Sequence, residues 1–356
     1  MHELNTGSAL QSGEVVDLFC GIGGISHGFK RAGFEIRAGY DLDASCRHGF
    51  EANNAAPFFT RDVGSLTAEE IRSRFSGTRP TVLVGCAPCQ PYSSYRQGKT
   101  DDRWSLLARF AKLACEVATD YVTMENVPGL VSYRDKTVFN SFLATLSETY
   151  PHVSHEIVDC AEFGVPQRRH RLVVIAGKDH EIRLDRSGQP APVSVADTIR
   201  TLPGIPAGGV DAHDPLHRAS NLTPLNLRRI RHSKPGGTWH DWPDDLIAAC
   251  HRTGKGAGYR SVYGRMAWNR PAPTMTTQCY GYGNGRFGHP EQDRAISLRE
   301  AALLQSFPME YSFFPDGRFP GFSTVGRWIG NAVPVKLAET IGAQIAQALC
   351  GERILA

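Results

Sequence analysis

The feature that most constrains the fold of this chain is the alternation of short apolar runs with amphipathic stretches across its first half. The apolar runs predict strands at residues 15–19, 35–40, 81–85, 121–124 and 171–176. The stretches between them predict helices at 25–32, 44–53, 65–75, 105–118 and 138–148. Because continuous apolar strands separated by helices are typical of parallel sheets buried on both faces, we expect such an α/β fold.

The second half of the chain has a different composition. Five prolines and the adjacent Gly208 and Gly209 fall between residues 187 and 215, where the hydrophobic periodicity fades. We place a domain boundary after Gly177 on this basis. Helical patterns return at 297–305 and at 335–349, the second of which predicts an amphipathic helix.

The overall composition, 41% hydrophobic and 21% charged residues, excludes a largely disordered chain. Its apolar runs are much shorter than the ~20 residues of a membrane helix, and residues 1–14 lack the pattern of a signal peptide. The nine cysteines are an odd number in a long chain, which indicates reduced thiols. We therefore expect a cytoplasmic protein that does not contact a membrane.

The net charge of +3 is too small to identify a nucleic-acid-binding protein by itself. Its distribution is more informative, because residues 216–264 contain eight basic and three acidic residues with Trp239, Trp242, Tyr259 and Tyr263 among them. Basic and aromatic side chains in one stretch suit phosphate and base contacts, although a solvated surface would also fit.

A glycine-rich turn follows the first predicted strand. Gly21, Gly23 and Gly24 lie where a strand passes into a helix, a place where the backbone can approach a ligand closely. Asp41 ends the second predicted strand, where an acidic side chain can bind ribose hydroxyls. The third glycine of a nicotinamide fingerprint is replaced by Ser26, which disfavours that cofactor.

Polar clusters flank three of the other predicted strands. Cys86 and Cys89 follow the third, Glu125 follows the fourth, and Arg169 and Arg171 lead into the fifth. The Cys-x-x-Cys spacing also fits a redox pair, whereas a zinc site needs two more ligands that the sequence does not place nearby. Since strand ends form the ligand crevice of open α/β sheets, these side chains are expected to converge on one cleft.

The motifs DLFCGIGG, APCQPYS, MENVPG, FGVPQRRHR, RMAWNRPAPTMTT and IGNAVP, in this order, resemble those of the DNA (cytosine-5)-methyltransferase family. The likeness extends from about residue 14 to residue 350. It implies a Rossmann-like S-adenosylmethionine-dependent methyltransferase domain with a smaller inserted target recognition domain. The implied boundaries are 1–177 for the catalytic domain, 178–321 for the recognition domain and hinge, and 322–356 for a C-terminal segment that completes the catalytic domain.

The resemblance implies a set of catalytic residues and no metal. Cys89 matches the thiolate that attacks carbon 6 of cytosine, which makes carbon 5 nucleophilic. Glu125 matches the carboxyl at ring N3, and Arg171, with Arg169 beside it, matches the guanidinium at O2. Cys86 is interpreted as a packing residue beside the cofactor.

The same resemblance implies a pocket for S-adenosylmethionine, in which Asp41 binds the ribose and Asp62 accepts a hydrogen bond from the adenine amino group. Two departures bear on affinity, because Asp41 replaces a longer glutamate and Leu42 stands where an aromatic residue is common. The residues carried over to this pocket are Phe19, Gly21, Ile22, Gly24, Asp41, Leu42, Asp62, Val63, Pro88, Leu106, Asn331 and Val333.

Double-stranded DNA is the expected partner, with the target cytosine flipped out of the duplex. The loop after Cys89 is expected to close over DNA, and the basic stretch is expected to read it. The residues assigned to DNA contact are Gln90, Ser93, Ser94, Arg96, Gln97, Arg228, Arg229, Arg231 and Lys234. A monomer is expected, associated with the nucleoid, with a cognate restriction endonuclease or a phage-defence system as a further partner. Three alternatives remain open: the same chemistry on RNA, a catalytically silent DNA-binding regulator, and a nicotinamide oxidoreductase.

Overall fold

The computed structural model describes residues 12–88, 104–187 and 191–355. They form two compact units. The sheet unit comprises Met1–Val158, His170–Arg186 and Val335–Ala356, and the second unit comprises Asp159–Arg169 and Ser187–Pro334. This division differs from the predicted boundaries, because it assigns residues 159–169 and 322–334 to the second unit and residues 178–186 to the sheet unit.

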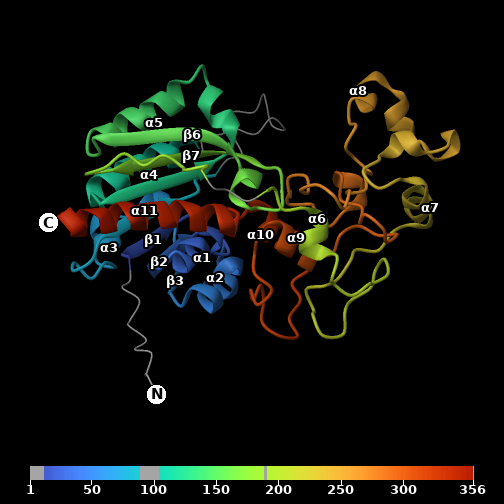
Figure 1. Cartoon of the computed structure of the whole chain (residues 1–356), viewed down its shortest axis with the longest axis horizontal. Helices are drawn as coiled ribbons and strands as arrows, with labels where there is room; N and C mark the ends of the chain where they lie inside the picture. The colour runs from blue at the N-terminus through green and yellow to red at the C-terminus, as the bar shows by residue number, and fades with distance from the viewer. Residues whose placement is uncertain (1–11, 89–103, 188–190, 356) are drawn as a thin grey trace. The chain divides into compact units, whose positions relative to one another are not determined.

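The sheet unit is built on a seven-stranded sheet with the order β3-β2-β1-β4-β5-β7-β6 (Figure 1). The first strand, β1, lies inside the sheet, with β2 and β3 on one side of it and the later strands on the other. The strand order therefore reverses between β1 and β4, and open α/β sheets bind ligands at such switch points. The strands are β1 (Glu14–Leu18), β2 (Glu35–Asp41), β3 (Phe58–Thr60), β4 (Thr81–Gly85), β5 (Tyr121–Asn126), β6 (His152–Asp159) and β7 (His170–Gly177).

The expectation of a wholly parallel sheet is wrong at one strand. β1 to β5 pair in parallel, but β7 runs antiparallel to β5, with Glu125 opposite Val173 and Asn126 opposite Leu172. The N-terminal end of β7 therefore lies beside the C-terminal end of β5. This reversal decides which side chains can meet at that edge of the sheet.

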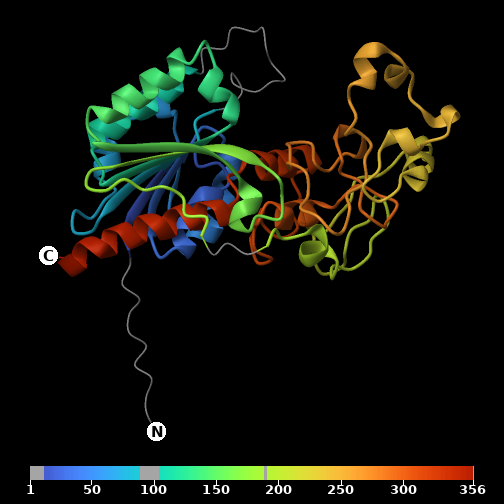
Figure 2. The ribbon, with the colours of Figure 1, turned by 45° about the horizontal axis from the view of Figure 1, so that its top comes forward.

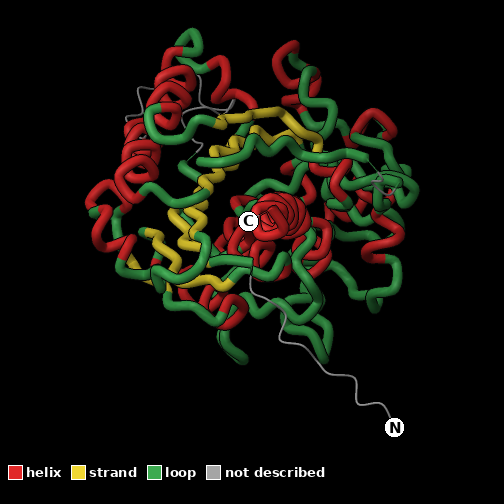
Figure 3. The backbone as a smooth tube through the Cα atoms, turned by 60° about the vertical axis from the view of Figure 1, so that its left-hand side comes forward, coloured by secondary structure: helices red, strands yellow, loops and turns green. Residues whose placement is uncertain are grey.

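Helices cover both faces of the sheet. Figure 2 shows α5 on the opposite side of the sheet from α11, and in Figure 3 the strands curve around α11, whose end is marked C. The helices of this unit are α1 (Gly24–Arg31), α2 (Arg47–Asn54), α3 (Ala68–Arg72), α4 (Trp104–Val117), α5 (Thr137–Ser147) and α11 (Val335–Leu355). None of the helices in the described ranges is long and apolar enough to cross a membrane.

The two helical layers pack differently. On one face, Phe110 of α4 and Phe142 of α5 stack at 6.4 Å within the main apolar core. On the other face α1 approaches α11 so closely that a Cβ on Gly28 would come within 2.4 Å of the Ala338 Cβ. The glycine therefore permits the close contact by which α11, from the end of the chain, covers the first helix of the sheet unit.

The second unit contains mainly short helices and irregular segments. Its α-helices are α6 (Val195–Ile199), α7 (Pro224–His232), α8 (Gly254–Ala257), α9 (Leu298–Leu304) and α10 (Phe322–Asn331). An apolar core in this unit gathers Ile230, Trp239, Trp242, Leu246 and Tyr282. The expected helix at 297–305 is present as α9, whereas the sequence pattern did not predict α6, α7, α8 or α10.

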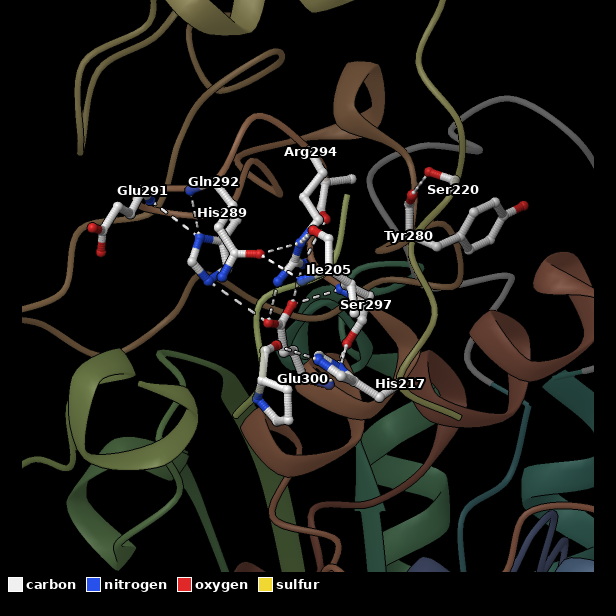
Figure 4. Close-up of polar contacts among 12 residues, drawn as sticks. Ile205, His217, Ser220, Tyr280, His289, Glu291, Gln292, Arg294, Ser297 and Glu300 are labelled. Atoms are coloured by element: carbon white, nitrogen blue, oxygen red, sulfur yellow. Dashed lines mark hydrogen bonds and ion pairs between the residues drawn. The ribbon is translucent and has the colours of Figure 1, made fainter. Parts of the chain in front are cut away.

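A buried polar network organises the start of α9 (Figure 4). Both oxygens of Glu300 accept from Arg294 at 2.7 Å, and Ile205 supplies its carbonyl to Arg294 Nε at 3.0 Å. Burial raises the pKa of Glu300, but the hydrogen bonds and the positive charge of Arg294, together with His289 and the Ser297 N–H, outweigh it. Its overall pKa is below the usual value, so the carboxylate is kept ionised. His217 contacts the Ser297 hydroxyl at 2.9 Å. The network thus connects Ile205 and His217, before and at the start of the basic stretch, to residues 294–300 after it.

Candidate active site

The glycine turn after β1 is held by the end of β2. The Gly21 N–H donates to Asp41 Oδ2 at 2.8 Å, and the Asp43 N–H donates to Asp41 Oδ1 at 2.8 Å. Burial raises the pKa of Asp41. Phe19 has a φ of 61°, an uncommon conformation for a residue with a side chain, and Gly21 has a φ of 50°. Such strain is typical of a turn shaped for a ligand.

Space remains at this turn. A Cβ on Gly21 would meet no heavy atom within 4 Å, so the backbone there is open to a bound group. Leu42, next to Asp41, is 70% exposed, and Ile22 is buried. A carboxylate beside an exposed apolar side chain suits a ribose carrying a flat base.

The other cofactor candidates lie in several elements. Asp62 Oδ1 accepts from the Gly64 N–H at 2.9 Å at an exposed position, and Val63 beside it is buried. Leu106 is half-buried in α4, and Pro88 lies after β4. Asn331 and Val333 belong to the second unit, so their part in this pocket stays a prediction.

Ser26 has a clear structural role. Its hydroxyl donates to Asp17 Oδ2 at 2.5 Å, and both side chains are fully buried beneath the glycine turn. Burial raises the pKa of Asp17 well above the usual value, and its Oδ1 accepts no hydrogen bond from the described residues. The serine that replaces the third glycine of a nicotinamide fingerprint thus anchors α1 to β1.

Glu125 and Arg171 form an ion pair at the edge where β5 ends. Arg171 Nε lies 2.8 Å from Glu125 Oε1, and both side chains are largely buried. The pair exists because β7 is antiparallel to β5, which brings the first residues of β7 beside the last residues of β5. In a parallel arrangement Arg171 would lie at the opposite edge of the sheet.

Cys86 has a partner that sequence reasoning did not identify. Its Sγ donates to Glu125 Oε2 at 3.2 Å, so the carboxylate has a cation on one oxygen and a thiol on the other. Asn126 Nδ2 donates to the Ala87 carbonyl at 3.1 Å and ties the end of β5 to the segment after β4. The pairing of adjacent strands β4 and β5 could have suggested both contacts.

Several predicted site residues lie outside the described residues. They are the expected nucleophile and the residues of the loop that follows it, Cys89, Gln90, Ser93, Ser94, Arg96 and Gln97. Pro88 is the last described residue before them. The residues described at this site lie at the ends of β4 and β5 and at the start of β7.

Arg169 has a different environment from Arg171. It belongs to the second unit, where Nη1 donates to the Met275 carbonyl at 2.8 Å and Nη2 to the Gly330 carbonyl at 3.0 Å. Its side chain is almost fully buried, with 3% exposure. These contacts indicate that Arg169 fixes backbone segments of the second unit, and a direct contact with substrate stays a prediction.

The basic residues expected to contact DNA also differ from one another. Arg228 pairs with Asp245 at 3.0 Å and Arg231 with Asp293 at 3.2 Å, all at exposed positions. A further residue, Arg229, is only 9% exposed and donates to the Leu246 carbonyl at 2.9 Å, while Lys234 is exposed. Buried Arg229 is therefore a structural residue in this conformation, since it stacks over the Trp242 ring.

Comparison with known proteins places these features in context. The profile of a family described as C-5 cytosine-specific DNA methylase matches residues 13–347. The chain is 48% identical over 342 residues to a protein of Herpetosiphon aurantiacus named Type II methylase M.HgiDII, covering 95% of this chain and 96% of the relative. It is 28% identical over 348 residues to the Type II methyltransferase M.Sau96I of Staphylococcus aureus, covering 92% of this chain and 74% of that protein.

A solved structure shares the fold. It is described as a putative DNA modification methyltransferase encoded within a prophage of E. coli, and it superposes with a TM-score of 0.74 at 24% identity. The match covers 95% of this chain and 99% of that one. The seven-stranded α/β architecture is thus one that a known protein of this kind adopts.

Proposed function

Because this chain belongs to the C-5 cytosine-specific DNA methylase family, we propose that it methylates a flipped-out cytosine within a specific DNA sequence through a covalent adduct with Cys89. The family consists of DNA cytosine-5 methyltransferases that use S-adenosylmethionine as methyl donor, and this chain is such an enzyme. The covalent step, the flipped base and the residue roles are the content of the proposal.

The chemistry requires carbon 5 of cytosine to become nucleophilic. Addition of the Cys89 thiolate to carbon 6 forms a carbon–sulfur bond and moves negative charge toward ring N3 and O2. S-adenosylmethionine, when bound, would supply an electrophilic methyl group to carbon 5, with its sulfur–methyl bond breaking and the sulfonium leaving as a neutral thioether. A base then removes the proton from carbon 5, and the carbon–sulfur bond breaks, which restores the aromatic ring and the thiolate.

The observation that carries the proposal is the Glu125–Arg171 pair, whose carboxylate also contacts Cys86, three residues before Cys89 in the sequence. A carboxyl at N3 and a guanidinium at O2 would offset the charge that the ring gains, at a site where burial strengthens both interactions. Arg171 also holds Glu125 in one orientation. The pair therefore supports electrostatic stabilisation of the covalent adduct.

The glycine turn fits the methyl donor. Asp41 presents a carboxylate for ribose hydroxyls, and the open backbone at Gly21 leaves room for a ligand that a side chain would exclude. Exposed Leu42 offers an apolar surface to the adenine ring. We assign to Asp62 the role of accepting a hydrogen bond from the adenine amino group. The remaining contacts with the cofactor are assigned to the other pocket residues named from the sequence.

We assign target recognition to the second unit. Its basic and aromatic composition supports contacts to phosphates and base edges. The loop that contains Ser93, Ser94 and Arg96 is assigned to closing over DNA. The name of the Herpetosiphon relative, Type II methylase, supports a role beside a restriction endonuclease of the same specificity.

Expression of the protein in a host that lacks other cytosine methylation tests the proposal directly. Bisulfite sequencing of a plasmid from those cells should reveal 5-methylcytosine in one sequence context. Cys89→Ala should abolish the signal while S-adenosylmethionine binding is retained. Duplex DNA with 5-fluorocytosine at the target should form a denaturation-resistant adduct with the wild type only. Methyl incorporation into RNA, with none into DNA, would contradict the assignment of the substrate.

A further inference from the structure

Two arginine side chains converge on one glycine turn of the second unit, residues 234–237. Arg286 Nη1 donates to the Gly236 carbonyl at 3.0 Å. Arg270 Nη2 lies 3.2 Å from the position that a Cβ on Gly236 would occupy. The Gly237 N–H donates to the Lys234 carbonyl at 2.8 Å, which closes the turn beneath them. Two guanidinium groups thus share one patch of backbone.

The backbone is adapted to these two side chains. Gly236 has a φ of 78°, a conformation that favours glycine, and a side chain there would also crowd the Arg270 head group. At Gly264 a Cβ would lie only 2.8 Å from Arg286 Cγ, so the absence of a side chain lets the Arg286 stem pass. The glycines hold the arginines in defined positions.

No carboxylate among the described residues neutralises either guanidinium. Other arginines of this unit, such as Arg265 with Asp293, have an acidic partner within 4.0 Å, but among the described residues Arg270 and Arg286 have none. Asp241, next to the turn, accepts a hydrogen bond at Oδ2 from the Thr238 N–H, at 3.1 Å.

The two like charges also affect each other. Burial, and after it the charge of Arg270, lowers the pKa of Arg286. Arg286 is half-buried, so water screens this repulsion incompletely, whereas Arg270 is exposed. A bound anion would relieve the repulsion, and a guanidinium is the side chain that best matches phosphate oxygens.

We propose that Arg270 and Arg286 together form a binding site for one phosphate group of the DNA backbone. The proposal rests on the proposed function, since it takes duplex DNA as the ligand. The Arg270 carbonyl accepts from the Val195 N–H, but the Arg270 side chain donates to no described residue, which leaves its five N–H groups for phosphate oxygens. Arg286, anchored at Gly236, supplies the second cation. A contact of this kind positions the enzyme on DNA without selecting sequence.

The test measures binding of two duplexes over a series of salt concentrations. One duplex contains the sequence that the enzyme methylates, and the other lacks it. Arg270→Gln and Arg286→Gln should each weaken binding to both duplexes by the same factor. Each should reduce the slope of log affinity against log salt by about 1, and the double variant by no more than about 1 in total if one phosphate is shared. Arg270→Lys, which keeps the charge, should retain most of the wild-type slope.

The control is Arg183→Gln in the sheet unit, where an exposed arginine pairs with Glu181 at 2.7 Å and no change in slope is expected. Arg270 is exposed, so its variant should fold even if Arg286→Gln unsettles the turn. Wild-type slopes in Arg270→Gln and Arg286→Gln would overturn the proposal. A loss confined to the target duplex would also overturn it, because it would indicate contact with base edges. A wild type that neither binds nor methylates DNA would instead contradict the proposed function.

Discussion

Arg171 Nε lies 2.8 Å from Glu125 Oε1 across an antiparallel pair of strands at the centre of the candidate active site. Glu125 is the second-last residue of β5 and Arg171 the second residue of β7. Their meeting depends on the one strand whose direction the apolar pattern did not predict. The strand reversal thus has a direct chemical consequence, because it supplies a buried carboxylate with its cation.

Replacing Glu125 by glutamine should lower kcat by about 10²–10⁴-fold, the range typical of losing a positioned proton donor or acceptor. The amide keeps the shape of the side chain but neither carries the charge that holds Arg171 nor exchanges a proton with ring N3. Single-turnover methylation of a defined duplex measures the effect, with S-adenosylmethionine affinity unchanged. Glu116→Gln, on the surface of α4, is the matched control. A kcat close to that of the wild type would remove Glu125 from the chemical step.

Cys86 should act as a positioning residue for Glu125. The thiol contacts Oε2 at 3.2 Å, and a thiol is a weak donor that an incoming ring can displace. Cys86→Ala should reduce kcat about 2–10-fold, the scale of one net hydrogen bond, with little change in the KM for DNA. Cys86→Ser retains a donor and should lose less than the alanine variant. Equal kcat values for the wild type and both variants would show that the contact does not matter for catalysis.

Asp41→Ala should weaken S-adenosylmethionine binding by about 1–3 kcal/mol, because ribose hydroxyls would lose their acceptor. Calorimetry measures this loss, and Asp179→Ala, at an exposed position, should show none. Burial raises the pKa of Asp41, so the carboxylate takes up a proton at a higher pH than an ordinary aspartate, which has a pKa of about 3.9. Wild-type binding should therefore weaken as the pH falls through that raised value. Cofactor affinity independent of residue 41 would exclude Asp41 from the pocket.

Asp17 should make stability depend on pH. Its folded-state pKa is raised by burial, so the folded protein binds a proton more tightly than the unfolded chain does. Stability should consequently fall as the pH rises from the unfolded value of about 3.9 to the folded value. Asp17→Asn keeps an acceptor for Ser26 but cannot ionise. Urea unfolding at several pH values should show that the free energy of unfolding of the variant increases relative to that of the wild type as the pH rises. A difference that does not change with pH would contradict this account.

The sequence was sufficient for the central part of the fold and for the strand ends that carry Asp41 and Glu125. The two strands it did not predict, β3 and β6, are the two edges of the sheet. Edge strands are partly exposed, so they lack the continuous apolar run that marks a buried strand. The sequence alone also could not show that Arg229 is buried while Arg228 and Arg231 are exposed, because the burial of Arg229 against Trp242 depends on tertiary packing.

The last prediction concerns where DNA sequence is read, and the buried network around Glu300 determines how it should be tested. An exchange of residues 178–264 alone would replace Ile205 and His217 but leave their partners Arg294 and Ser297 in place. Such a hybrid would disrupt the buried network. The sharper experiment exchanges residues 221–288 for the equivalent segment of a relative with another target and keeps the network intact.

We expect this hybrid to be folded and active, because Glu125, Arg171 and Cys89 are unchanged, and to methylate the sequence of the donor relative. Bisulfite sequencing of plasmid DNA identifies the sites, and the melting temperature shows whether the network survives. A second hybrid limited to residues 265–288, which contain Gly281, Gly283, Gly285 and Gly288 as well as Arg286, separates this segment from the basic stretch before it. An active 221–288 hybrid that keeps the original target would assign recognition to residues outside this segment, because base-edge contacts are what distinguish one sequence from another.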